Sequence, residues 1–359
     1  MAVDGVALWR ALAASPRFSG TKPLTAARDR CRAALVVLGF SVVEQPFEFS
    51  IFPARWGMPV VGGASTLLLA IVLWGHGSRG PRAAWMAMAT AVAMLTLLVR
   101  WLTGPGAQRL RWARVSGVNL QATRGPEPRL WLVAHLDSKS QRYPLAWRAL
   151  GGALLLAAWA GAVLATAVAQ GGRSPLAFTI LLVGVVGAAL LGLGAVGNDS
   201  PGAVDNASGV AAVIQAASLL PAGVSVGVVI TDAEELGLAG AHAWAASRRP
   251  GMAVNVDTLD DAGALRLLMH GARGGGLRGA VVRASERTSQ RCRVRRLPPG
   301  VLTDGVALAR AGWSTATLTR STLRTLARIH TSRDCVGAMQ GSAIASAAAL
   351  LAAIVEEAP

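Results

Sequence analysis

The chain has 359 residues, of which 53% are hydrophobic and 15% are charged, and its mean hydropathy is +0.45. These values exclude a disordered chain, and they are too apolar for a purely soluble protein, in which about 25% of residues are charged. The 35 Lys and Arg residues outnumber the 19 Asp and Glu residues, and the net charge of +16 suits nucleic acid or lipid headgroups. Three scattered cysteines are too few for a disulfide framework or a thiolate zinc cluster. The composition predicts a membrane protein with a soluble part.

The N-terminal region predicts two amphipathic helices, over 5–15 and 24–39. A signal peptide is disfavoured, because Asp4 and Arg10 interrupt the apolar run that it needs. Four uncharged apolar segments follow, at 57–75, 83–99, 149–169 and 177–197. Each has roughly the 17 to 21 residues that cross a hydrocarbon core about 30 Å thick. Four buried helices of a soluble protein are the alternative, but core helices of this length rarely lack every ionisable side chain.

Short connections at 76–82 and 170–176 join the four segments into two hairpins. Small residues such as Gly184 and Gly187 would let the helices approach closely. The absence of ionisable residues within the segments argues against a proton relay, an ion site or a transport path. We therefore expect two membrane anchors.

The rest of the chain predicts a single α/β domain. Short apolar strands alternate with helical stretches, which is typical of a mixed, largely parallel central sheet flanked by helices. The expected strands include 130–134, 224–230 and 253–256, and the expected helices include 206–220, 236–248 and a closing helix over 341–355. The predicted order is α/β domain 1–56, hairpin 57–103, α/β domain 104–148, hairpin 149–197 and α/β domain 198–359.

An arginine-rich segment lies at 273–296. Basic segments can bind nucleic acid, but this one has no interleaved aromatic residues for stacking on bases and no known reading motif. We expect a solvated or lipid-facing surface and no nucleic-acid partner.

Acidic and histidine residues occur where the predicted strands end. Ligands of an open α/β sheet bind at the carboxyl ends of its strands. Two imidazoles and several carboxylates without a thiolate suit a hydrolytic pair of zinc ions. The residues concerned are His135, Asp137, Asp205, Glu234, Glu235, Asp257 and His330.

Each of these residues alone has a structural explanation, such as a helix cap for Asp205. Together, the ordered series H-x-D, D-N-A-S-G-V, E-E, a strand-end D and H-T-x-x-D resembles the M28 family of metallopeptidases. The N-terminal stretch SPRFSGTKPLTAARDRC also resembles the opening of that family. The resemblance covers nearly the whole chain apart from the four apolar segments. It implies a zinc-exopeptidase-like fold, peptidase activity and two zinc ions per chain.

The resemblance also implies a set of metal ligands. His135 and Asp257 would hold one zinc ion, and Glu235 and His330 would hold the other. Asp205 would bridge the two ions, because a carboxylate presents two oxygens with separate lone pairs.

Four further acidic residues receive roles from the same resemblance. Glu234 would be the general base that moves a proton from water to the leaving amine. Asp137 would accept the free N–H of the first histidine ligand. Asp334 would do the same for the second histidine ligand, and Asp304 would be a helper near the site.

The remaining candidate residues are explained by structural roles. His76, His242 and His270 are expected to be structural or surface residues. Asp199, Asp260 and Asp261 lie near the site in sequence, but turns and helix caps explain them equally well.

The predicted function is a membrane-anchored dizinc metallopeptidase, in the first place an aminopeptidase. Glutaminyl cyclases, which keep one zinc, share the A-H-x-D-S-K stretch that residues 134–139 echo, so a cyclase-like or other amidohydrolase is one alternative. A non-catalytic scaffold is another. Asn206 and the complete ligand set favour the peptidase. The sequence gives neither the oligomeric state nor the substrate side-chain preference.

Arginines concentrate at the hairpin ends that adjoin the α/β domain, and the positive-inside rule therefore predicts that this domain lies in the cytoplasm. We expect an integral protein of a bacterial-type inner or plasma membrane. The fourth apolar segment ends about 8 residues before Asp205, and an extended chain covers at most about 3.3–3.6 Å per residue. We therefore expect peptide substrates at the bilayer surface, with a simple tether as the alternative.

Overall fold

In the computed structural model, which describes residues 3–143, 145–168, 174–194, 196–271, 275–298 and 300–358, the chain divides into two units. The description covers only the main chain at 76–81, 145 and 275. The first unit comprises Met1–Phe49, Arg114–Ser140 and Asn198–Pro359. The second comprises Ser50–Ala113 and Gln141–Gly197.

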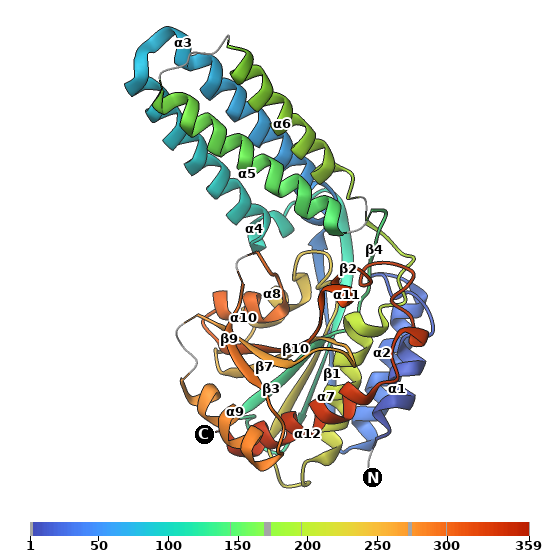
Figure 1. Ribbon diagram of the computed structural model, residues 1–359. Coiled ribbons are helices and arrows are strands. Elements are labelled where there is room, and N and C mark those ends of the chain that lie inside the picture. The colour runs from blue at the N-terminus through green and yellow to red at the C-terminus, as the bar shows by residue number, and fades with distance from the viewer. Residues whose placement is uncertain are drawn as a thin grey trace. The chain divides into compact units, whose positions relative to one another are not determined.

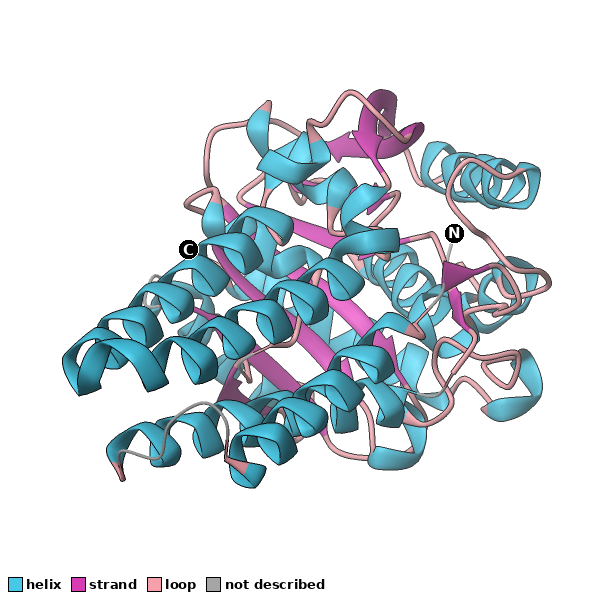
Figure 2. Cartoon of the chain, turned by 90° about the horizontal axis from the view of Figure 1, so that it is seen from above, coloured by secondary structure: helices cyan, strands magenta, loops and turns pink. Residues whose placement is uncertain are grey.

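An eight-stranded sheet forms the centre of the first unit (Figure 1). Its order is β1-β2-β6-β3-β7-β10-β8-β9. Strands β6, β3, β7 and β10 are mutually parallel, β2 and β8 run antiparallel to their inner neighbours, and β9 is parallel to β8. The bounds are β1 Ser41–Ser50, β2 Arg114–Arg124, β3 Leu130–His135, β6 Val226–Thr231, β7 Met252–Leu259, β8 Leu265–His270, β9 Arg293–Arg296 and β10 Ser314–Arg320. Figure 2 shows the strands in magenta and the helices in cyan.

Helices cover both faces of this sheet. Alternate residues of each strand point to opposite faces, so each central strand contributes side chains to two cores. On β3, Leu130, Leu132 and Ala134 join the larger core, whereas Trp131 and Val133 join the smaller one. The larger core receives α1 (Gly5–Leu12), α2 (Lys22–Val37), α7 (Ser208–Leu219), α9 (Gly275–Arg287) and α12 (Ser342–Glu357). The smaller core receives α8 (Ala239–Ala246) and α10 (Asp304–Arg310). This two-sided burial explains why the central strands read as nearly continuous apolar runs.

The expected fold class, a largely parallel sheet flanked by helices, is confirmed. The predicted strands at 130–134, 224–230 and 253–256 correspond to β3, β6 and β7. The predicted helix over 341–355 is α12, and most of its residues are buried in the larger core.

The arginine-rich segment forms α9 and the edge strand β9, while Arg273 lies outside the described residues. Arg283 Nε lies 2.8 Å from Glu357 Oε2, and Arg287 pairs with Glu356. Part of this basic segment is therefore paired with the C-terminal end of α12.

The second unit consists of α3 (Phe52–Leu102), α4 (Pro105–Gln108), α5 (Leu145–Ala167) and α6 (Pro175–Gly192). It contains four helical segments long and apolar enough to cross a membrane: Phe52–Gly75, Arg82–Leu102, Ala146–Ala167 and Pro175–Gly192. These match the four predicted segments. Helical backbone also continues through 76–81, where a loop was expected, while residues 170–173 of the second expected loop lie outside the described residues.

Helix α3 reverses direction despite its continuous helical backbone. A straight helix of 51 residues would be about 77 Å long, yet Ile51 N donates to Ala113 O at 2.9 Å. Its two arms share one apolar core, to which Leu69 and Met88 both belong.

Small residues set the close approach of the helices in this unit. A Cβ atom placed on Gly151 would lie 2.8 Å from Gly187 O, so only glycine fits there. A side-chain hydrogen bond from Trp159 Nε1 to Ser65 Oγ, 2.8 Å long, links α5 to α3. Close backbone contact and a few buried hydrogen bonds are the means by which helices associate in lipid.

Candidate metal and catalytic site

Two groups of acidic and histidine side chains meet at the carboxyl end of the sheet. The first contains His135, Glu234 and Asp257, and the second contains Asp205, Glu235 and His330; in each group the potential ligand atoms lie within 4.8 Å of one another. His135 ends β3, Asp257 lies in β7, and the Glu pair follows β6. Asp205 lies in the turn η1 (Ala203–Ala207), and His330 follows α11 (Leu323–Leu326). All five predicted ligands and the predicted base are thus brought together.

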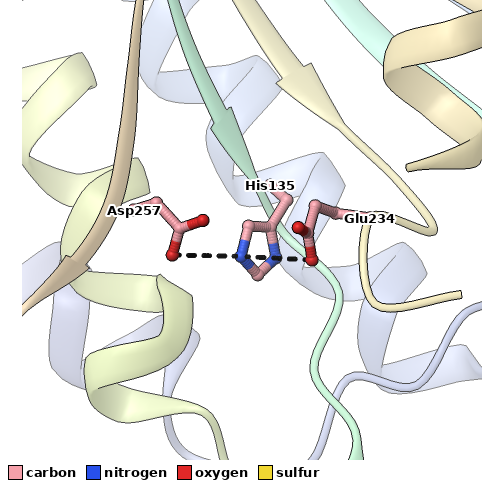
Figure 3. A group of neighbouring side chains, drawn as sticks. All are labelled: His135, Glu234 and Asp257. Atoms are coloured by element: carbon pink, nitrogen blue, oxygen red, sulfur yellow. Dashed lines mark ion pairs between the residues drawn. The ribbon is translucent and has the colours of Figure 1, made fainter. Parts of the chain in front are cut away.

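His135 is the centre of the first group. Figure 3 shows its ring between the carboxylates of Asp257 and Glu234. His135 Nε2 lies 3.8 Å from Glu234 Oε2, 3.9 Å from Asp257 Oδ1 and 3.2 Å from Asp205 Oδ1. The side chain of His135 is only 1% exposed, so its contacts with these carboxylates are shielded from bulk water.

Asp205 joins the two groups through its two oxygens. Its Oδ1 faces His135 Nε2 at 3.2 Å, and its Oδ2 faces His330 Nε2 at 3.1 Å. The second group is completed by Glu235 Oε1, 3.2 Å from the same nitrogen of His330. One carboxylate with an oxygen directed to each histidine has the arrangement that a bridging metal ligand requires.

The donor atoms fit a pair of zinc ions. Two ligands of a tetrahedral zinc, each about 2.0–2.1 Å from the metal, stand roughly 3.3 Å apart, which agrees with the separations around Asp205. His135 Nε2 and Glu235 Oε1 are buried and have no hydrogen-bond partner among the described residues. Nitrogen and carboxylate donors without thiolates are the zinc ligands of hydrolytic sites.

Protonation of the histidines reflects the negative charge around them. Burial lowers the pKa of His330, but the carboxylates of Glu235 and Asp205 beside it more than offset burial and raise the pKa to about 9. The pKa of Asp205 is shifted far below its ordinary value, because the two histidines outweigh its burial. A cation bound here would take the place of these protons.

Asp137 positions the Glu pair. Its Oδ1 accepts the main-chain N–H of Glu234 at 3.0 Å, and its Oδ2 accepts that of Glu235 at 3.1 Å. His135 Nδ1 lies 3.1 Å from the main-chain carbonyl of Asp137 and 3.6 Å from the carboxylate. The expected support for His135 therefore comes from the carbonyl of Asp137, while the carboxylate orients the base and a ligand of the second group.

Asp334 holds the segment of the bridging residue. It was expected to support His330, but its Oδ1 accepts the N–H of Val204 at 2.8 Å and its Oδ2 accepts that of Asp205 at 3.1 Å. Asp334 is fully buried. The expectation was wrong because the chain turns between His330 and Asp334, where Thr331 O accepts the N–H of Asp334.

The D-N-A-S-G sequence joins the bridging turn to strand β7. Asn206 Nδ2 donates to Val256 O at 2.7 Å, and Asn206 Oδ1 accepts the N–H of Thr258 at 3.2 Å. A Cβ atom on Gly209 would lie 2.1 Å from Asn206 Oδ1, so glycine is required there. The motif thus fixes Asp205 against the strand that carries Asp257.

Asp260 and Asp261 have separate structural roles. Asp260 Oδ2 accepts hydrogen bonds from Thr325 Oγ1 at 2.5 Å and from Arg328 Nη2 at 2.9 Å, which ties β7 to the loop of His330. Asp261 accepts the N–H groups that begin α12, including that of Ala343 at 2.9 Å. The cap interpretation suits Asp261, whereas Asp260 supports a ligand segment.

Glu234 and Asp304 are acids in a crowded, buried environment. Burial raises the pKa of Glu234 well above its ordinary value; His135 opposes the shift, and the neighbouring carboxylates add to it. Burial also raises the pKa of Asp304 to about 7, although its hydrogen bond from Thr231 lowers it. Glu234 is therefore protonated more readily than an ordinary glutamate, which suits a group that must accept and hold a proton.

Two cations near the site were missed by the sequence analysis. Lys139 Nζ lies 2.7 Å from Glu235 Oε2 and donates to Glu235 O at 3.0 Å. Arg17 is fully buried among main-chain carbonyls beside the site. Arg17 belongs to the SPRFSG stretch that carried the family resemblance, and Lys139 belongs to the A-H-x-D-S-K stretch shared with glutaminyl cyclases, but their spacing gave no role for either.

The other histidines and Asp199 lie outside the two groups. His242 is on α8, and burial lowers its pKa to about 4. His270 ends β8, with its Nε2 2.8 Å from Thr317 Oγ1. The side chain of His76 lies outside the described residues. Asp199 is hydrogen-bonded to Ser140 across 59 residues, and this contact gives it a structural explanation.

Comparison with known proteins matches residues 118–355 to peptidase family M28. Among solved structures, the chain resembles an aminopeptidase from Aneurinibacillus sp. strain AM-1, with a TM-score of 0.59 and 14% identity, over 99% of this chain and 93% of that one. It also resembles BSAP, a zinc aminopeptidase from Bacillus subtilis, with a TM-score of 0.57 and 14% identity, over 98% of this chain and 94% of the other.

A glutaminyl cyclase from Fimbriiglobus ruber has a similar likeness, with a TM-score of 0.56 and 16% identity, over 99% of this chain and 94% of the cyclase. At such low identities these likenesses show a common fold. No curated protein matched the sequence.

Proposed function

Because this chain belongs to peptidase family M28, we propose that it is a membrane-anchored dizinc peptidase that removes N-terminal residues from peptides. The observation that carries the proposal is Asp205, whose two oxygens face His135 at 3.2 Å and His330 at 3.1 Å. A carboxylate shared in this way suits a site for two ions about 3.5–4 Å apart. The same acid in a structural role would need only one partner.

Each metal ion would have its own terminal ligands. His135 and Asp257 would hold the first ion, Glu235 and His330 would hold the second, and Asp205 would serve both. When bound, the ions supply polarisation of the scissile carbonyl and activation of the attacking water. Lys139 would fix Glu235 as a one-oxygen ligand, because its ammonium group already holds Oε2 at 2.7 Å.

Glu234 would move the proton in this reaction. Its carboxylate accepts a proton from the attacking water and delivers it to the nitrogen of the leaving amine. Asp137 fixes the main chain of Glu234 through a 3.0 Å hydrogen bond. This hydrogen bond would hold the carboxylate of Glu234 in a fixed position beside His135, where the substrate would bind.

A cyclase-like amidohydrolase is the second candidate function. It is favoured by the sequence His-Leu-Asp-Ser-Lys at 135–139 and by the fold shared with the Fimbriiglobus ruber enzyme. The presence of both ligand groups favours the peptidase. A scaffold without activity would not need to keep all six of these polar side chains together.

Membrane anchoring is supported by the four apolar helical segments. Along the sequence, Arg55, Arg100, Arg109, Arg111, Arg142 and Arg148 lie near the points where the second unit joins the first, whereas Arg79, Arg82 and Arg173 belong to the predicted connections 76–82 and 170–176. The positive-inside rule then places the first unit in the cytoplasm. The segment ending at Gly192 precedes Asp205 by only 13 residues (205 − 192), which favours peptide substrates at the bilayer surface.

The test combines metal analysis with a substrate panel on the purified full-length chain. We expect about two zinc ions per chain, hydrolysis of aminoacyl substrates and little action on the same substrates with a blocked N-terminus. A Glu235→Gln control should lose metal. One zinc ion with cyclisation of N-terminal glutamine would favour the second candidate, and a metal-free, inactive chain would refute both.

A further inference from the structure

Arg17 is a buried cation that no step of the proposed reaction uses. Its side chain is fully buried. Its guanidinium donates four hydrogen bonds, and all four go to main-chain carbonyls. Removing a cation from water costs several kcal/mol unless the geometry of its contacts compensates. The role of Arg17 therefore depends on which segments of the chain carry these four carbonyls.

The four carbonyls come from three separate stretches of chain. Nε donates to Leu136 O at 2.8 Å, Nη1 donates to Leu12 O at 2.8 Å and to Pro201 O at 2.5 Å, and Nη2 donates to Gly202 O at 3.0 Å. A planar guanidinium with five N–H groups can serve this many acceptors at fixed angles. A lysine ammonium is a compact point charge without that planar fork.

Two of these stretches carry metal ligands. Leu136 stands between His135 and Asp137, and Gly202 leads into the turn of Asp205. Arg17 thus bridges the segment of the first histidine and the segment of the bridging carboxylate.

The main chain at Arg17 repeats the same connection. Arg17 N donates to Ser138 Oγ at 2.9 Å, and Ser138 N donates to Arg17 O at 3.0 Å. Ser138 Oγ in turn donates to Ser200 O at 2.9 Å. A Cβ atom on Gly202, which has φ +59°, would lie 2.6 Å from Ser138 Cβ and 3.1 Å from Arg17 Nη2. Arg17, Ser138 and Gly202 are therefore packed too closely for a side chain to fit at position 202.

We propose that Arg17 is a positioning residue of the metal centre. Its guanidinium sets the separation of the two ligand segments, so that His135 Nε2 and Asp205 Oδ1 stand 3.2 Å apart and can share one ion. The inference rests on the proposed function, because it concerns the same metal site.

Cobalt binding to the full-length protein in detergent tests the proposal. The main variant is Arg17→Lys, which keeps the charge and loses the planar fork. Arg124→Lys is the matched control, because Arg124 also donates to main-chain carbonyls, those of Leu220 at 3.2 Å and Pro221 at 3.3 Å, but remote from the ligands. Chelator competition gives the affinity, and the visible spectrum of Co²⁺ reports ligand geometry independently of activity.

We expect Arg17→Lys to bind Co²⁺ about 10- to 100-fold more weakly with a changed visible band, as for other partners of metal ligands. Arg124→Lys should keep both properties. A folded Arg17→Lys protein with wild-type affinity and spectrum would overturn the proposal. If Arg17→Lys does not fold, Ser138→Ala replaces it, with a smaller loss of affinity and a spectral change expected; wild-type values there would overturn it too.

The two proposals fail in different ways. A wild-type chain that binds no Co²⁺ would refute the metal site and the role of Arg17 together. A wild-type chain that binds two ions and cleaves peptides, while folded Arg17→Lys behaves like it, would refute the role of Arg17 alone.

Discussion

The two units of the chain use charge in opposite ways. All 19 acidic residues belong to the first unit, and many of them are buried at the ligand groups or at the residues that hold them. The second unit has no acidic residue, and its basic residues are all arginines. Where the first unit holds its segments together with buried carboxylates, the second does so with close-packed glycine and alanine and a hydrogen bond such as that of Trp159.

This difference follows from the solvent that each unit would face. A buried carboxylate is stable only where N–H groups, histidines or cations surround it. The first unit supplies them around Asp205, Asp137 and Asp334. Hydrocarbon offers no such partners, so an unpaired acid within a membrane span is costly. Chemistry therefore concentrates in one unit, and the other is restricted to packing.

Replacement of the base is expected to have the largest effect. Glu234→Gln keeps the size of the side chain but cannot accept a proton, so the rate should fall by about 10²- to 10⁴-fold or more while both metals remain bound. Steady-state kinetics and metal analysis on one preparation check this. Trp56→Ala in the second unit is the control and should leave kcat nearly unchanged in detergent. Near-wild-type turnover by Glu234→Gln would refute the assigned base.

The metal-free protein should lose stability as the pH rises. The pKa of His330 is raised from 6.5 to about 9 in the folded chain, so its contribution is complete below pH 6.5 and lost as the pH approaches 9. Over this window the loss is at most about 3 kcal/mol. Thermal unfolding in chelator at pH 6.5 and 9 measures it. His330→Gln should flatten the dependence, and an equally steep profile in that variant would contradict the assignment.

Asp334→Asn should weaken metal binding without loss of a ligand. The amide can accept only one of the two N–H groups that Asp334 now holds, so Asp205 becomes less fixed and affinity should fall about 10- to 100-fold. Asp261→Asn is the matched control, because Asp261 also accepts main-chain N–H groups but at the start of α12. Isothermal titration with zinc compares them, and equal losses in the two variants would contradict a role specific to the site.

The smallest effect is expected in the second unit. Trp159→Phe removes the hydrogen bond to Ser65 and should destabilise that unit by about 0.5–1.5 kcal/mol. Thermal unfolding in detergent, monitored separately from zinc content, measures the change. Zinc content should stay the same, and a loss of metal in Trp159→Phe would break the separation between the two units.

The sequence predicted the fold class and the candidate ligands because both depend on local patterns. Apolar strands that end in His135 and Asp257 are visible within a few residues, and H-x-D and D-N-A-S-G keep fixed spacings. The four apolar segments were equally clear, since length and hydropathy are properties of each segment alone.

The contacts that hold the ligands could not be predicted in this way. Asp334 meets Asp205 across 129 residues, and Arg17 meets Gly202 across 185. Spacing in the motif H-T-x-x-D suggested instead that Asp334 supports its neighbour His330. Such long-range partners are chosen by the fold, and a single sequence has no periodicity that reports them.

Ser140 and Asp199 are joined by two hydrogen bonds, from Asp199 N to Ser140 Oγ at 3.0 Å and from Ser140 Oγ to Asp199 Oδ2 at 3.2 Å. The chain therefore leaves the first unit and returns to it at almost the same point, although 58 residues (199 − 140 − 1) intervene. The entropy of closing a loop grows only slowly with its length, so a fold closed at this point could gain or lose a long insertion at little thermodynamic cost. In evolution, the helices between Ser140 and Asp199 could therefore be gained, lost or exchanged while the ligand segments on either side of this junction keep their positions.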